Sequence, residues 1–243
     1  MRRVAAVLIG AFLLAPAIAQ DAKPTFPRWK PGEQTGTVRI GDQDESFVAL
    51  VPRGYTARKK WPVVLLAHGN GGDARGFLQH LKPMAGKRPP LLVSLERCDN
   101  QQNAVGYVPK YLVELEKQFH IDPDQVYALG FSGGGFRLWD DIVCKKDVLP
   151  RFRGVVLVGS GKQSFDPPPA PEKAPTIVFV GDPRDQNYAK SRPAAAERLK
   201  ELGFEVIVHE HSAGHSLPPR EIKAVFAWIA KQIKTKKRAR SAR

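Results

Sequence analysis

Short runs of consecutive apolar residues alternate along this chain with segments in which apolar residues recur every three or four positions. The run at residues 62–67 (PVVLLA) contains no polar residue, which is typical of a strand buried on both faces of a sheet. Residues 108–119 instead place Tyr111 and Leu115 on one helical face. These patterns predict strands at residues 37–40, 47–51, 62–67, 91–95, 126–130, 154–158, 176–180 and 204–209.

Helical patterns fill most of the intervals between the later strands. Asp73 is a suitable N-cap for the first of them, because its side chain can accept a hydrogen bond from a free backbone N–H. The helices are expected at residues 74–81, 108–119, 136–148, 193–202 and 219–233. Strands that alternate with helices indicate an α/β fold, here a twisted, mostly parallel sheet of about eight strands with helices on both faces.

The N-terminal residues have the pattern of a secretory signal peptide. Arg2 and Arg3 precede an apolar run at residues 4–14, and Ala17-Ile18-Ala19 forms a small-residue cleavage site. An uncleaved membrane anchor is the alternative, but the run is short and is followed by Pro16. We therefore expect export to the periplasm or the extracellular space and no stable membrane anchor. The chain then divides into a signal peptide (1–19), an extended lead-in (20–36), the α/β domain (37–233) and a basic, disordered tail (234–243).

Composition fits one globular domain and adds a strong positive charge. Of the 243 residues, 42% are hydrophobic and 26% charged, which is enough for a single core. The net charge of +14 includes Arg2 and Arg3, and much of the remainder lies in the C-terminal tail. Such a tail can contact nucleic acid, anionic lipid or an acidic polymer, but a solvated chain end is the favoured interpretation. The sequence has no nucleic-acid motif and no Cys/His cluster with metal-ligand spacing, so we expect neither a nucleic-acid partner nor a metal.

The chain has two cysteines, Cys98 and Cys144. In an oxidising compartment they could form one disulfide, since one follows a strand beside the strand at 126–130 and the other lies on the next helix. Two separate buried thiols are the alternative, and the sequence leaves both open.

Ser132 lies in the sequence Gly130-Phe131-Ser132-Gly133-Gly134, which fits the nucleophile-elbow pattern G-x-S-x-G. Strand formers precede this sequence and helix-compatible residues follow it, which is the structural context that the motif requires. The elbow holds its serine in strained backbone geometry, so the neighbouring residues must be small. A glycine-rich strand–helix turn with a serine by chance is the alternative.

Other residues with catalytic potential follow later strands. In a parallel sheet the carboxyl ends of the strands form the ligand-binding edge, so the loops with His68, Ser132, Asp182, Asp185 and His215 should meet there. Their order of serine, acid and histidine suits a triad in which histidine activates the serine and a carboxylate orients the histidine.

The histidine and the acid each have rivals. His215, in a glycine-rich loop after the last strand, is preferred to His209 at the end of that strand and to His211 early in the loop. Asp185 is preferred as the acid, because Asp182 with its following proline is typical of a turn residue that bonds local amides. Asp182 remains the alternative acid.

A tetrahedral intermediate needs donors for its negative charge. The N–H of Gly133 follows the nucleophile directly, and the loop His68-Gly69-Asn70-Gly71-Gly72 occupies the place of a second donor. We expect the Asn70 amide to be that donor and His68 to be structural. A tight turn that merely leads into a helix would need a similar sequence.

The loop at 68–72, the elbow at 130–134 and the segment Gly214-His215-Ser216-Leu217-Pro218 together resemble the α/β-hydrolase superfamily. They are especially similar to small secreted esterases of the polyhydroxybutyrate depolymerase-like, feruloyl esterase-like and dienelactone hydrolase-like groups. The resemblance implies that Ser132 is the nucleophile, His215 the base and Asp185 its carboxylate partner. In one respect the sequence departs from the pattern: family members commonly place the acid three residues after the strand's glycine, whereas Asp185 is four after Gly181, which keeps Asp182 in play.

The segment between the sixth and seventh strands is too short and proline-rich for a large lid, so an open pocket is expected. Its walls are expected to include Phe131, Tyr107, Phe136 and Tyr188, although Phe136 could equally belong to the core.

The function that follows is a secreted serine hydrolase that cleaves carboxylic esters through an acyl-enzyme on Ser132, without a cofactor. Its substrate would be a small or polymeric ester whose acyl and alcohol groups the sequence does not identify. A peptidase or thioesterase with the same triad is one alternative. A non-catalytic hydrolase-like binding protein is another, although such proteins tend to lose the triad that is present here. The sequence carries no signal for the oligomeric state.

Overall fold

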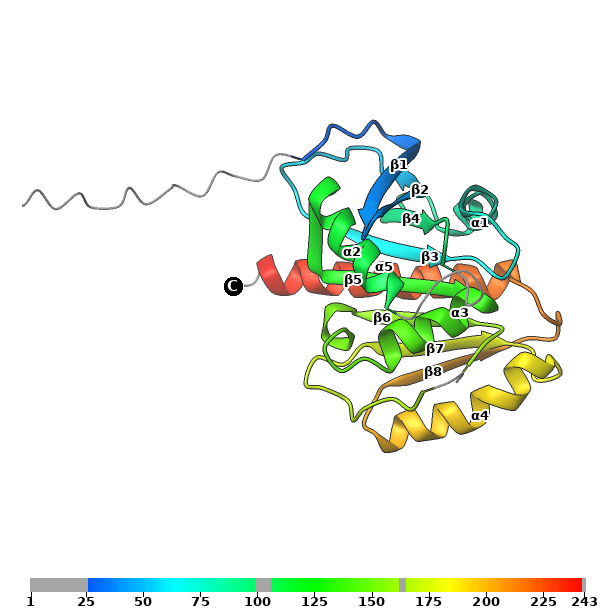
Figure 1. The fold of residues 1–243 in the computed structure, drawn as a ribbon. Coiled ribbons are helices and arrows are strands. Elements are labelled where there is room, and N and C mark those ends of the chain that lie inside the picture. Colours follow the sequence, from blue (N-terminus) through cyan, green and yellow to red (C-terminus); the bar gives the residue numbers. More distant parts are fainter. Residues whose placement is uncertain (1–25, 99–105, 162–164, 242–243) are drawn as a thin grey trace, which may run out of the picture.

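The structure, a computed structural model, describes residues 26–98, 106–161 and 165–241, and the side chains up to residue 235 (Figure 1). The segment expected to be a signal peptide lies outside the described residues. The strands are β1 (Gly32–Ile40), β2 (Gln43–Val51), β3 (Trp61–Ala67), β4 (Leu91–Leu95), β5 (Ile121–Phe131), β6 (Gly154–Val158), β7 (Thr176–Gly181) and β8 (Val206–Glu210). The main helices are α1 (Ala74–Leu81), α2 (Tyr107–Gln118), α3 (Gly133–Leu138), α4 (Gln186–Glu201) and α5 (Pro219–Ser241).

The strands form one sheet in the order β1-β2-β4-β3-β5-β6-β7-β8. β1 and β2 form an antiparallel hairpin, and β2 also pairs antiparallel with β4. From β4 to β8 every pairing is parallel. The prediction of a mostly parallel sheet of about eight strands is confirmed.

Helices cover both faces of the sheet (Figure 1). Side chains along each strand alternate between these two faces. On β3, Val63 and Leu65 pack in the core under α2, α3 and α4, whereas Val64 and Leu66 pack in the core with α1 and α5. All four side chains are fully buried, which explains why this strand has no polar residue.

The predicted boundaries of helices and strands agree best with the structure where a single local signal defines them. Asp73 caps α1 by accepting a hydrogen bond from the Gly76 N–H at 2.8 Å, and α1 ends at Leu81 as expected. The prediction for α4 was wrong: the helix begins at Gln186 rather than at Pro193, because Asp185 caps it and Pro193 lies inside it. The helix after Ser132 is also shorter, since α3 ends at Leu138 and a wider π-helical turn (Trp139–Val143) follows.

The two ends of the predicted domain also differ from the structure. β1 begins at Gly32, inside the expected lead-in, and Trp29 stacks on Phe119 with ring centroids 4.8 Å apart. At the other end α5 continues past Ile233 to Ser241, so the backbone of the basic segment is helical there rather than a disordered tail. Among the described residues, no helix combines the length and apolar character needed to cross a bilayer.

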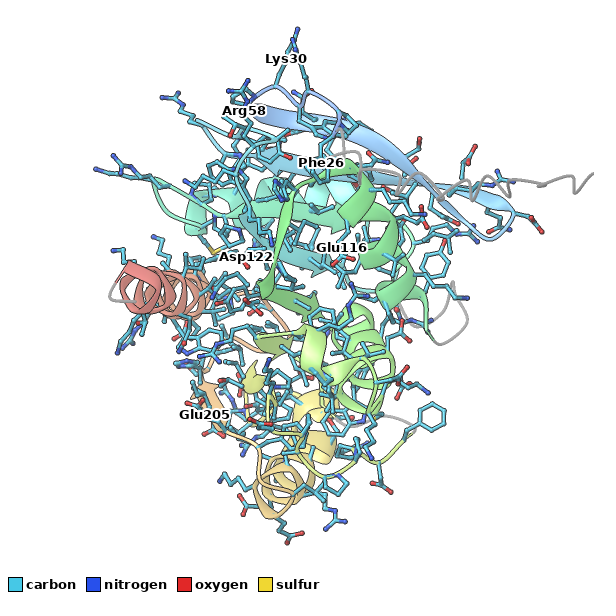
Figure 2. All side chains as sticks on the ribbon, turned by 90° about the vertical axis from the view of Figure 1, so that its left-hand side faces the viewer. Phe26, Lys30, Arg58, Glu116, Asp122 and Glu205 are labelled. Atoms are coloured by element: carbon cyan, nitrogen blue, oxygen red, sulfur yellow. The ribbon has the colours of Figure 1, made fainter. Side chains whose placement is uncertain are left out.

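Figure 2 looks onto the edge of the sheet where most parallel strands begin, with Arg58, Asp122 and Glu205 labelled on it. Arg58 precedes β3, Asp122 lies near the start of β5, and Glu205 directly precedes β8. The loops that carry the candidate catalytic residues follow β3, β5, β7 and β8 and therefore lie at the opposite edge. In the described part of the chain, no helical lid is inserted between β6 and β7.

Candidate active site

Ser132 connects β5 to α3 in a strained backbone conformation. Its φ of 50° and ψ of −119° make it the one non-glycine residue with a positive φ in the described part of the chain. The surrounding structure holds this geometry: the Ser132 N–H donates to Val158 O at 2.9 Å, and the Phe136 N–H donates to Ser132 O at 3.0 Å. A strained serine at a sharp strand–helix turn is the arrangement of a nucleophile elbow.

Two glycines allow the elbow to pack against its neighbours without any side chain between them. A Cβ on Gly130 would lie 2.6 Å from Gly134 O. A Cβ on Gly134 would lie much closer to the Ala67 and His68 carbonyl oxygens than van der Waals contact allows. The backbone of α3 therefore lies directly on the end of β3. The segment that follows β3, residues 68–72, is called the glycine loop.

The loop between β8 and α5 (residues 211–218), here called the histidine loop, carries His215 to the same edge of the sheet. His215 Nδ1 lies 2.6 Å from Asp185 Oδ2, and the Asp185 side chain is only 4% exposed. The imidazole ring packs at 4.9 Å, centroid to centroid, from Phe131, which directly precedes the serine. Gly159, at the end of β6, leaves room for the ring, because a Cβ there would lie 3.1 Å from His215 Nδ1.

His215 thus contacts Asp185 and lies beside Phe131, the residue before Ser132. Among the described residues Ser132 Oγ has no hydrogen bond to His215, a contact that often tightens only when substrate is bound. With a carboxylate at Nδ1, the imidazole presents Nε2 as the free acceptor, which is the tautomer that a general base requires.

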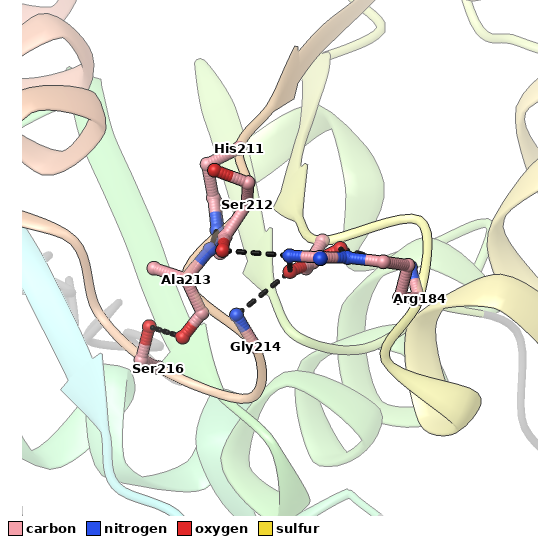
Figure 3. A network of polar contacts seen from close by, with 7 residues as sticks. Arg184, His211, Ser212, Ala213, Gly214 and Ser216 are labelled. Carbon is pink, nitrogen blue, oxygen red and sulfur yellow. Dashed lines mark hydrogen bonds and ion pairs between the residues drawn. The ribbon is translucent and has the colours of Figure 1, made fainter.

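Asp182, the alternative acid, binds the backbone of the histidine loop instead of its imidazole. Its carboxylate accepts hydrogen bonds from the Gly214 N–H at 2.7 Å and from Arg184 Nη2 at 2.8 Å. Arg184 also donates to Ser212 O at 2.7 Å, so the guanidinium reaches across to the loop (Figure 3). The hydrogen bonds from Arg184 and Gly214 hold the pKa of Asp182 well below its usual range.

The glycine loop after β3 lies beside the nucleophile. A Cβ on Gly69 would lie 3.3 Å from the Ser132 Cβ. The N–H groups of Asn70 and Gly133 donate to no protein acceptor in the described residues. His68 is buried, and its ring nitrogens lie 2.8 Å from Gly69 O and 2.7 Å from Glu96 O, so it holds the loop as a structural residue.

An open cleft of about 360 Å³ adjoins this loop. Phe77 of α1, Phe131 of the elbow and Leu217 of the histidine loop supply its apolar lining. The full lining is His68, Gly69, Asn70, Gly71, Gly72, Asp73, Gly76, Phe77, His80, Phe131 and Leu217. Of the expected pocket walls, Phe131 is the one found here.

The other expected walls lie elsewhere. Tyr188 was predicted to line the pocket, but it is fully buried, packs against Gly181, and has Arg192 over its ring at 5.1 Å. Burial raises the pKa of Tyr188 to about 12. The early start of α4 is the reason, because it turns this side chain into the core. Tyr107 packs on Tyr111 at 5.3 Å and does not line the cleft found in the described residues. Phe136 is half-buried and does not line it either.

The disulfide that the sequence left open between Cys98 and Cys144 is not formed. The thiol of Cys98 donates to Leu95 O at 3.2 Å, and that of Cys144 donates to Phe165 O at 3.3 Å. Each sulfur is therefore turned toward a different part of the backbone.

Sequence reasoning missed three contributors to this site, namely Gly159, Arg184 and Leu217. Leu217 could have been found, since it lies two residues after the chosen histidine and is the apolar residue of that loop. Arg184 had no sequence signal, because its partner in the histidine loop, the Ser212 carbonyl, is a backbone group far along the chain.

Known proteins share part of this sequence and most of this architecture. Acyl-protein thioesterase 1 of Gibberella zeae is 27% identical over 130 residues, which are 51% of this chain and 55% of that protein. The match thus spans about half the length of this curated relative. No protein-family model matches the chain.

Solved structures of esterases superpose on most of the chain. Esterase 2 of Thermogutta terrifontis, phosphoramylated by tabun, has a TM-score of 0.67 at 12% identity and covers 86% of this chain and 97% of its own. The Bacillus cereus carboxylesterase has a TM-score of 0.59 at 17% identity, covering 77% of this chain and 94% of its own. A feruloyl esterase module from Clostridium thermocellum has a TM-score of 0.59 at 14% identity, covering 81% and 88%. These similarities show the α/β-hydrolase fold that the sequence predicted.

The elbow packing predicts a large stability loss for Gly134→Ala. The added methyl group would meet the Ala67 carbonyl, which belongs to a buried strand and cannot move aside, so we expect a loss of about 3 kcal/mol or more. Gly72→Ala is the control, because its nearest contact, Gly69 O at 3.1 Å, is in a loop, and a smaller loss is expected. Urea unfolding measures both. Equal midpoints for Gly134→Ala and the parent protein would contradict the packing described here.

The lowered pKa of Asp182 predicts a pH-dependent contribution to stability. A carboxylate whose pKa is lower in the folded than in the unfolded state stabilises the fold above its unfolded pKa of about 3.9, and this effect is lost as the pH falls toward the folded value. The parent should therefore be more stable than Asp182→Asn at pH 6, and the difference should shrink below about pH 4.

Urea unfolding between pH 3 and pH 7 measures this difference. Asp147→Asn is the matched control, because its exposed carboxylate makes no ion pair among the described residues. A difference between parent and Asp182→Asn that grows on acidification would show that the sign is wrong.

Proposed function

We propose that this chain, which has the α/β-hydrolase fold, is a serine hydrolase that cleaves carboxylic esters through an acyl-enzyme on Ser132. The observation that carries the proposal is the 2.6 Å contact between His215 Nδ1 and Asp185 Oδ2 beside the strained elbow serine. Three residues from distant parts of the chain have the types and order that nucleophilic catalysis needs.

In the proposed reaction Ser132 Oγ attacks the ester carbonyl while His215 Nε2 takes its proton. Asp185 keeps the other ring proton on Nδ1 and stabilises the imidazolium that forms. The imidazolium then protonates the departing alkoxide, which leaves as the alcohol and completes the acyl-enzyme. Water, deprotonated by the same imidazole, attacks the acyl-enzyme and releases the acid.

Asn70 and Gly133 are proposed to stabilise the negative charge on the carbonyl oxygen. Their N–H groups lack protein acceptors in the described residues, and the glycine loop approaches the Ser132 Cβ closely. Donors that are held in place before the reaction do not have to reorganise as the charge develops, which is why such pairs contribute strongly to catalysis.

The cleft beside this loop would take an apolar part of the substrate. Phe77, Phe131 and Leu217 offer aliphatic and aromatic surface, and about 360 Å³ lies within the size range of small-molecule sites. Because the cleft is open, one end of a polymeric ester could also extend away from it.

A thioester is the second candidate substrate. It is favoured by the partial sequence match to an acyl-protein thioesterase, and the same nucleophile and base would serve for a thiolate leaving group. The values of kcat/KM for an acetyl thioester and for the corresponding oxygen ester, measured in competition, show which of the two substrate classes the protein prefers.

Export is part of the proposal and rests on residues 1–19 alone. Cell fractionation of the native host, with mass analysis of the N-terminus, tests it. A chain that begins at Met1 and stays in the cytoplasm would contradict it.

The triad predicts a graded loss of activity. Ser132→Ala and His215→Ala should each lower kcat for p-nitrophenyl acetate at least about 10⁴-fold, because nucleophile and base act as a unit. Asp185→Asn should lower it about 10²- to 10⁴-fold, because the amide favours the wrong imidazole tautomer. His209→Ala is the matched control and should retain activity, since His209 lies on β8 rather than in the histidine loop. Full activity in Ser132→Ala would exclude the mechanism.

The cleft predicts a change in acyl-chain preference on Leu217→Trp. An indole at this position fills space beside Phe131, so kcat/KM for p-nitrophenyl butyrate should fall relative to that for the acetate, by about tenfold or more. The ratio of the two kcat/KM values, measured at one pH in parent and variant, is the readout. An unchanged ratio would mean that the acyl chain of the substrate binds outside this cleft.

A further inference from the structure

The turn after β7 carries a second carboxylate that the proposed reaction does not use. Asp182 directly follows the last residue of β7, and its side chain is 1% exposed, whereas that of Arg184 is 72% exposed. A buried carboxylate needs several hydrogen-bond donors to remain ionised. Here those donors come from two different loops.

Each carboxylate oxygen of Asp182 accepts two hydrogen bonds. Oδ1 accepts from the Arg184 backbone N–H at 2.9 Å and from Arg184 Nε at 3.1 Å. Oδ2 accepts from Arg184 Nη2 at 2.8 Å and from the Gly214 N–H at 2.7 Å. The guanidinium therefore binds the carboxylate in a bidentate manner, which fixes its plane as well as its distance.

Arg184 continues the connection to the histidine loop. The nitrogen that binds Asp182 Oδ2 also donates to Ser212 O at 2.7 Å (Figure 3). Ser212 and Gly214 are thus held from the same side, with only one residue between them, and His215 follows Gly214 directly. We call this set of four residues, Asp182, Arg184, Ser212 and Gly214, the turn–loop clamp.

Few other contacts restrain this part of the loop. Among the described residues, every hydrogen bond between residues 212–216 and a segment outside their own loop involves the turn at residues 182–185. The remaining ones, such as Ser216 Oγ to Ala213 O at 2.9 Å, are internal to the loop. The position of the imidazole therefore depends on this turn.

We propose that Asp182 and Arg184 are positioning residues that set the backbone of the histidine loop so that the His215 imidazole can reach both Asp185 and Ser132. This inference rests on the proposed function for its catalytic consequence. The two carboxylates of the turn have different roles, because Asp182 binds the loop backbone and Asp185 binds the imidazole.

The clamp also accounts for the unusual spacing of the acid. Asp185 lies four residues after Gly181, and its N–H donates to Asp182 O at 2.9 Å, which closes a tight turn. The family pattern commonly places the acid three residues after this glycine, and the one extra residue here lies within the turn. Arg184 is part of the same turn, and its side chain folds back over Asp182. Asp185 then reaches His215 from the end of the turn.

The test uses Arg184, because its side chain is exposed and its removal leaves the hydrogen bond from the Gly214 N–H to Asp182 in place. Arg184→Ala should lower kcat for p-nitrophenyl acetate about 10- to 100-fold with KM within about twofold of the parent, since misplacement of a catalytic group affects the chemical step. Arg184→Lys should lose nearly as much, because one ammonium cannot replace a planar bidentate donor. Arg198→Ala, which removes an exposed arginine paired with Glu201 on α4, is the matched control and should leave kcat unchanged.

Hydrogen exchange provides a readout that does not depend on activity. In Arg184→Ala and Asp182→Asn the Gly214 amide should exchange about tenfold faster or more than in the parent, because the acceptor carboxylate loses its fixed orientation in the first variant and its charge in the second. Parental kcat together with parental exchange in Arg184→Ala would overturn the clamp. If the parent hydrolyses no ester or thioester, the proposed function fails, whereas the exchange result still decides whether the clamp holds the loop.

Discussion

The close approach of α3 to the end of β3 is the constraint on which the rest of the site depends. Because Gly130 and Gly134 have no side chains, the backbone of the elbow lies directly on the carbonyls at the end of β3. This contact holds Ser132 at a positive φ and places it beside the glycine loop. Nucleophile and oxyanion donors are therefore positioned by one backbone contact, with no flexible side chain in between.

Parallel strand order brings the remaining groups to the same edge. β6, β7 and β8 run parallel to β5 and end at the same edge of the sheet, so Gly159, the turn at residues 182–185 and the histidine loop lie at that edge although they are distant in sequence. Each contributes something different: space for the imidazole, two carboxylates, and the imidazole itself. The site is thus assembled from short loops on a rigid sheet, which is the usual way that such folds position catalytic groups.

Much of this arrangement could be predicted from the sequence, because several signals are local. β4 and β6 have the predicted bounds since every residue in them is buried and all but Ser94 are apolar or glycine, and Asp73 defines the start of α1. Where two signals competed, the prediction failed: Pro193 suggested a helix start, but the cap at Asp185 begins α4 earlier, and this one error also misplaced Tyr188. The spacing of Asp182 and Asp185 could not show which carboxylate faces the imidazole, because that depends on a loop about thirty residues away.

The role assigned to Arg184 goes against a general expectation about surface ion pairs. An exposed arginine paired with a carboxylate usually contributes little, because water screens the charges and the side chains lose freedom. Here the carboxylate is buried, accepts four hydrogen bonds and shares its partner with a backbone carbonyl of another loop. Removing the arginine would leave a buried charge with fewer donors, a costlier change than breaking an exposed pair. The effect of this pair is therefore expected to depend on the histidine loop that it restrains more than on the attraction between its two charges.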